Sequence, residues 1–154
     1  MALAAAAGVL IVGGPFAGAA LTSHDGSSAA PVHTGGAAME LYRQGEKHHA
    51  TDPDTGVDAT VSLERRPWGT HVALRLGNVT GPRACALVAV GRDGAEQTVT
   101  TWAVPEGGYG VRDAAVRRNR EPLYIHGGAA MDRGAIARFD VRTLDGERLV
   151  RVTL

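Results

Sequence analysis

From Glu46 onward, apolar and polar residues alternate along the chain with a period of two. In VDATVSLE, residues 57–64, one face is apolar throughout and carries Val57, Ala59, Val61 and Leu63. HVALRL, residues 71–76, repeats the pattern, with His71 and Arg75 on the polar face. Such alternation predicts β-strands that turn one face to the core and the other to water.

Further predicted strands follow at regular intervals, separated by turn residues. ACALVAV, residues 84–90, is apolar on both faces, which predicts a central strand. Asp93-Gly94 and Asp145-Gly146 are typical of hairpins, because glycine accepts the positive φ of tight turns. The other predicted strands are a short one at 47–51 and those at 96–104, 123–126, 136–143 and 148–154. This spacing, with no βαβ unit, predicts an all-β fold, either a barrel or, as we expect, an antiparallel β-sandwich of seven to eight strands that is immunoglobulin-like.

The start of the chain differs in character from this strand-rich part. Residues 1–21 carry no charge and are long enough to cross a bilayer as a helix, so we expect a transmembrane helix. A cleaved signal peptide is the alternative, since Ala17-Gly18-Ala19 fits a cleavage site although no basic residue precedes it. A buried helix of a soluble protein is the third interpretation of this segment. Residues 22–45, rich in Ser, Gly and Ala, predict a flexible linker, with a weak signal for one turn of helix at 37–43. Residues 46–154 form the predicted folded domain.

Charge and cysteine content narrow the classes of function. The 16 basic and 16 acidic side chains cancel, whereas a nucleic-acid footprint needs a positive excess. Cys85 is the only cysteine, so an internal disulfide and a cysteine zinc cluster are both excluded within this chain. Its place in the most apolar strand predicts a buried, unreactive thiol. No nucleophile, base or metal triad can be assembled, and we expect no enzyme activity and no cofactor.

The histidines raise a metal hypothesis. His48 and His49 are adjacent, so on a strand they face opposite sides and do not readily share an ion. His71 and His126 occupy outward positions of separate strands and are the candidate ligands if a metal binds. With Met39 they resemble copper-binding sandwiches of the periplasm, since imidazole and thioether ligands suit copper. The spacing itself specifies no site, and we expect solvated or structural histidines.

Two further groups of side chains are candidates for binding. Trp68 and Trp102 are expected to pack in the core, with a sugar-binding face as the alternative if either is exposed. The longest irregular stretch, residues 105–122, carries four arginines, which are Arg112, Arg117, Arg118 and Arg120. A solvated loop is the simpler interpretation, and a contact surface for an acidic partner or lipid head groups is the functional one.

Several phrases occur together in a fixed order. They are TDPDTGV (51–57), WGTHVALRL (68–76), GPRACALVAVGRDG (81–94), TWAVPEGGYGV (101–111) and HGG (126–128). In these phrases the chain resembles the extracytoplasmic domain of membrane-anchored, zinc-type anti-sigma factors. The resemblance implies a cytoplasmic zinc-binding domain that holds a sigma factor, a membrane helix, a linker and an outer β domain that senses a signal.

The chain departs from that pattern at one place. It lacks the His and Cys-x-x-Cys zinc ligands of the cytoplasmic domain, so a sigma factor is a partner only if such a domain lies upstream. A miscalled gene start or a remnant without the inhibitory half would both account for this. We therefore expect a single-pass membrane protein whose outer domain is a non-catalytic sensor or interaction module regulating transcription. A secreted or anchored copper-binding or surface-binding sandwich is the alternative.

Overall fold

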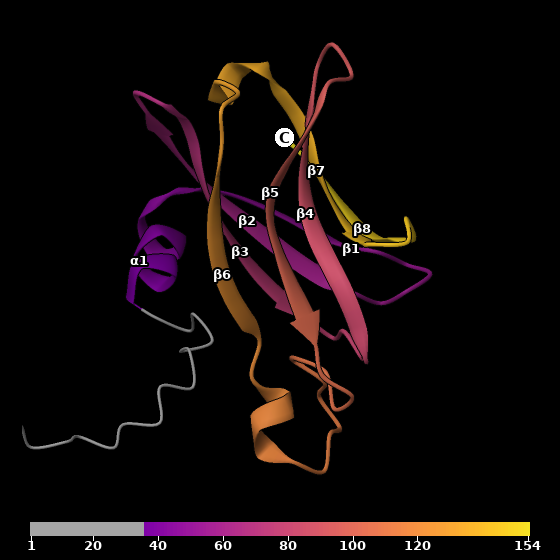
Figure 1. Cartoon of the computed structure of the whole chain (residues 1–154). Helices are drawn as coiled ribbons and strands as arrows, with labels where there is room; N and C mark the ends of the chain where they lie inside the picture. Colours follow the sequence, from indigo (N-terminus) through magenta and orange to yellow (C-terminus); the bar gives the residue numbers. More distant parts are fainter. Residues whose placement is uncertain (1–35) are drawn as a thin grey trace, which may run out of the picture.

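The computed structural model describes residues 36–154 (Figure 1). The expected membrane helix at 1–21 and most of the expected linker lie outside these residues. Within residues 36–154, no helix has both the length and the apolar character needed to cross a bilayer. The elements in chain order are α1 (Gly36–Gln44), β1 (Glu46–Thr51), β2 (Asp58–Arg66), β3 (Gly69–Gly77), β4 (Arg83–Gly91), β5 (Glu96–Val104), β6 (Leu123–Ala129), β7 (Ile136–Thr143) and β8 (Arg148–Thr153). Two short 3-10 helices, η1 (Arg117–Arg120) and η2 (Arg133–Ala135), flank β6.

The eight strands form two antiparallel sheets of four. One sheet has the order β1-β2-β3-β6 and the other the order β5-β4-β7-β8. Every strand pair is antiparallel. The predicted all-β antiparallel fold is therefore confirmed, and β4 takes the interior position that its two apolar faces predicted.

In the described residues, one large hydrophobic core lies between the two sheets. The apolar faces predicted for β2 and β3 point into it, and Val61, Leu74 and Leu76 are almost fully buried. From the opposite sheet, Leu87 and Phe139 enter the same cluster. The second apolar face of β4 lies outside this core and forms a smaller cluster of Ala86, Val88 and Val90. Burial between the sheets is the main stabilising term, because free energy follows the apolar area removed from water.

The hairpin turns form where the Asp-Gly pairs predicted them. Gly94 joins β4 to β5 with φ of 84°, and Gly146 joins β7 to β8 with φ of 103°. Other residues reach such backbone angles only with strain, which is why glycine marks these turns in the sequence.

Residues 36–45 differ from the flexible linker that the sequence predicted for 22–45. Helix α1 packs on the outer face of the β1-β2-β3-β6 sheet (Figure 1), against β2, β3 and β6. Its contacts include the buried Ala38 and Leu41 and an edge-to-face pair between Tyr42 and Tyr124. The sequence signal for this helix was weak because the segment has only nine residues, many of them small or polar. Only two apolar residues at helical spacing, Ala38 and Leu41, are buried.

Candidate functional site

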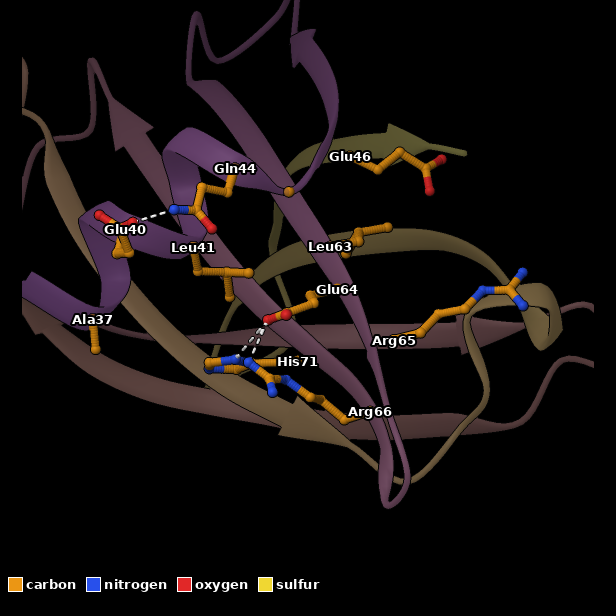
Figure 2. Close-up of a pocket in the computed structure, with 11 residues that line it drawn as sticks. Ala37, Glu40, Leu41, Gln44, Glu46, Leu63, Glu64, Arg65, Arg66 and His71 are labelled. Carbon is orange, nitrogen blue, oxygen red and sulfur yellow. Dashed lines mark hydrogen bonds and ion pairs between the residues drawn. The ribbon is translucent and has the colours of Figure 1, made fainter.

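A cavity of about 610 Å³ opens between α1 and the strands β2 and β3 (Figure 2). The helix supplies Ala37, Glu40, Leu41 and Gln44, with Gly45 and Glu46 following it. The strands supply Leu63, Glu64, Arg65, Arg66 and His71. The lining combines acidic, basic and imidazole side chains with an apolar floor, which suits a polar ligand or a protein segment.

His71 and His126 meet beside this cavity. In the strand register, His71 lies opposite Gly128 and His126 lies opposite Ala73, so the two histidines are diagonal neighbours on one face. The Nε2 atom of His71 is 3.1 Å from the Nδ1 atom of His126, and the ring centroids are 5.3 Å apart. The structure thus brings together the two candidates that the sequence named for the metal alternative, and it does not test whether a metal binds.

Glu64 occupies the other side of the His71 ring. Its Oε2 atom is 3.8 Å from the Nδ1 atom of His71, and it accepts a 2.8 Å hydrogen bond from Arg66 (Figure 2). Burial lowers the pKa of His71 below its ordinary value, and the neighbouring His126 lowers it further, against the opposing effect of Glu64. The His71 imidazole is therefore neutral at neutral pH and keeps one nitrogen lone pair free to accept a proton or bind a ligand.

Trp68 forms the outer wall of this histidine site. Its side chain is 54% exposed, and its ring centroid is 5.9 Å from that of His71. The expectation that Trp68 packs in the core is wrong, because Trp68 lies in the turn between β2 and β3 and its side chain is largely exposed. Trp102 is partly buried and packs against the core, as expected.

The remaining histidines and the cysteine lie elsewhere. His48 hydrogen-bonds Glu46 at 2.8 Å, whereas His49 hydrogen-bonds Asp58 at 2.7 Å, so the adjacent pair does face opposite ways. The Cys85 side chain is buried in the core, and burial raises the pKa of its thiol. In the part of the chain that the structure describes, no group of three or more His, Cys, Asp or Glu side chains forms a ready metal site.

Three of the four loop arginines, Arg112, Arg118 and Arg120, do not converge on one site. Arg112 lines a cavity with Asp58 and Arg75, whereas Arg118 lines a different one beside Tyr109. Arg120 donates to the carbonyl of Ala114 within its own loop. A contact surface for an acidic partner thus remains a prediction for these residues, with the arginines spread over the loop.

An ionic cluster on the outer face of the β5-β4-β7-β8 sheet escaped the sequence analysis. The carboxylate of Asp140 is fully buried and accepts hydrogen bonds from Arg142 at 2.7 Å and Arg151 at 2.8 Å. Burial alone would raise the pKa of Asp140, but these two guanidinium groups outweigh it and lower that pKa. The strand pattern did not reveal this cluster, because Asp140 occupies an outward position where a charged residue is expected to be solvated.

Comparison with known proteins identifies one set of relatives. The chain is 33% identical over 111 residues to the anti-sigma-L factor RslA of Mycobacterium tuberculosis, in three strains of that organism. The match covers 70% of this chain and 39% of the relative, so the chain spans well under half of the length of RslA. No family model matches the chain, and no solved structure matches it significantly. The chain is thus similar to part of an anti-sigma factor.

Proposed function

We propose that residues 36–154 form the extracytoplasmic sensor or interaction domain of an anti-sigma factor system, anchored in the membrane by residues 1–21. The observation that carries the proposal is the 33% identity with RslA over 111 residues. The domain regulates transcription through a partner and catalyses no reaction. A sigma factor is its partner only if a cytoplasmic zinc-binding domain belongs to the same protein.

The contacts of α1 support a route for the signal. In the sequence, the helix follows the expected anchor and precedes the first strand, and it lines the same cavity as Glu64 and His71. A ligand in that cavity would therefore contact both α1 and the β2–β3 hairpin. Such a ligand shifts the domain between states only if it binds one of them better. We infer that the two states differ in α1, which is packed on the sheet in one state and released from it in the other.

The strand order supports the immunoglobulin-like type of sandwich. With β1 taken as an extra edge strand, β2, β3 and β6 correspond to strands A, B and E. In the opposite sheet, β4, β7 and β8 correspond to C, F and G, and β5 to the additional C′ strand. Domains of this architecture bind partners through their faces and end loops, and the cavity lies on a face.

Two measurements on the native gene test the proposal. Alkaline phosphatase fused after Leu154 should be active, because that enzyme folds only outside the cytoplasm. An inactive phosphatase in a stably expressed fusion would refute the membrane topology. Deletion of residues 46–154 should change the transcripts of a group of genes that share one promoter sequence. An unchanged transcriptome under envelope stress would refute the regulatory role.

A surface-binding module is the second candidate, and the exposure of Trp68 favours it. An exposed indole beside a polar cavity is the arrangement that stacks on a sugar ring or an apolar side chain. Retention of the purified chain on cell-wall glycan that disappears in Trp68→Ala would favour this candidate. Equal retention of the wild type and of Trp68→Ala would exclude it.

A further inference from the structure

We propose that His71 and His126 bind one divalent transition-metal ion, most tightly Cu²⁺, through the two ring nitrogens that face each other. The inference rests on the placement of these nitrogens and is independent of the proposed regulatory role. Neither the comparison with RslA nor the strand pattern assigns such a site.

The separation of the two nitrogens fits a shared ion. Metal–imidazole bonds are about 2.0–2.1 Å long, so two nitrogens 3.1 Å apart subtend an angle of about 100° at the ion. That angle lies between the right angle of a square-planar ion and the wider angle of a tetrahedron. A shared ion lies off the line that joins the two nitrogens, so each ring turns by about 40° from the orientation in which the lone pairs face each other, and water molecules complete the coordination.

Glu64 lies on the side of His71 that favours the tautomer a metal requires. A proton on the Nδ1 atom of His71 faces the Glu64 carboxylate and leaves the Nε2 lone pair directed at His126. With the His126 proton on its own Nε2 atom, two lone pairs then face each other and repel. A cation between them removes this repulsion, and the pairing of a carboxylate with a ligand imidazole is common at metal sites.

The surroundings allow an ion to enter and to stay. His71 is one-fifth exposed and lines the cavity, so the ion has a path from solvent. The positive charge of Arg66 opposes a cation, but its ion pair with Glu64 offsets that charge. Cys85 cannot compete for the ion because its side chain is buried in the core. Cu²⁺ binds nitrogen ligands more tightly than the other divalent ions of its row, which makes it the preferred probe.

Trp68 provides a local reporter. Cu²⁺ is paramagnetic and quenches indole fluorescence at short range, and the Trp68 ring lies 5.9 Å from the His71 ring. Titration of the full chain with Cu²⁺ should give saturable quenching at one ion per chain. Trp68→Phe should abolish most of that quenching while calorimetry still records binding, since the indole is not a ligand.

Matched double variants identify the ligands. His71→Ala/His126→Ala should weaken Cu²⁺ binding at least ~10-fold, whereas His48→Ala/His49→Ala removes as many imidazoles and should leave it unchanged. The single variant His126→Gln, which keeps a polar group at the site, should also weaken binding if the first double variant folds poorly. Glu64→Gln should lower the affinity by about 10-fold without changing the melting temperature of the metal-free protein, as expected of a positioning residue.

The results that would overturn the proposal are equally specific. Equal binding by the wild type and by His71→Ala/His126→Ala would show that the two rings share only a hydrogen bond. Loss of binding in His48→Ala/His49→Ala would place the ion on β1 instead. Failure of the wild type to bind Cu²⁺ at all would dismiss the site and leave the regulatory proposal untouched.

Discussion

The hydroxyl of Ser62 in β2 donates a 2.9 Å hydrogen bond to the backbone carbonyl of Leu41 in α1, and both residues are buried. The same carbonyl also accepts from the backbone N–H of Gly45, where the chain turns from helix into strand. This bond fixes the last turn of α1 on the outer face of the sheet. An outward-facing serine that would otherwise be solvated thereby becomes part of the packing between helix and sheet.

Leu41 is the residue whose loss should release α1. Its side chain is 6% exposed, so Leu41→Ala should cost about 2–3 kcal/mol of unfolding free energy. Hydrogen exchange should also become faster in residues 36–45. Leu144→Ala is the matched control, because Leu144 is 63% exposed and the same truncation should be nearly neutral there. Equal destabilisation by the two variants in urea denaturation would show that α1 does not depend on this contact.

Asp140 should be the most sensitive polar residue of the described domain. Asp140→Ala leaves Arg142 and Arg151 without their shared buried partner and should cost about 3 kcal/mol in chemical denaturation. Glu96→Ala removes the other partner of Arg142 and is the control. Glu96 is an exposed carboxylate, so its loss should have a much smaller effect. If Asp140→Ala costs as little as Glu96→Ala, water has replaced the carboxylate as the hydrogen-bond partner of the two arginines.

The lowered pKa of the Asp140 carboxylate predicts that folding stability depends on pH in the acid range. The folded state holds the pKa of Asp140 below its ordinary value of 3.8, so the unfolded chain binds more protons in this range. Stability should therefore be level above about pH 5 and fall as the pH drops below 3.8 towards the folded pKa. Glu46, whose pKa is lowered to about 2 by Arg133 and His48, should contribute in the same direction. In urea denaturation between pH 6 and pH 2, Asp140→Asn should show a shallower loss than the wild type, and an identical slope would contradict this.

The strands could be predicted from sequence because their signals are local. The alternation in 57–64, the two apolar faces of 84–90 and the two Asp-Gly turns each report a property of a few consecutive residues. The pairing of His71 with His126 was foreseen only as two outward positions. Their contact depends on strand β6 lying next to β3, which no short window of sequence contains.

The features that the sequence did not reveal are all set by distant parts of the chain. Ser62 is buried only because α1 covers it, and Asp140 only because Arg142 and Arg151 close over it. Trp68 is exposed because it lies in the turn between β2 and β3, although large aromatic side chains are usually buried. Each case reverses a rule based on residue type, and each reversal has its cause in the tertiary structure.

Gly128 should control the position of Trp68 and hence the wall of the histidine site. A Cβ atom at Gly128 would lie 2.8 Å from the Trp68 ring, so Gly128→Ala should push the indole away from His71 and further into water. Its emission should shift to the red and Cu²⁺ should quench it less, while stability changes little because the ring is already half exposed. Gly134→Ala is the matched control, since a Cβ atom there meets no atom within 4 Å. An unchanged emission spectrum in Gly128→Ala would mean that the indole does not rest on Gly128 in solution.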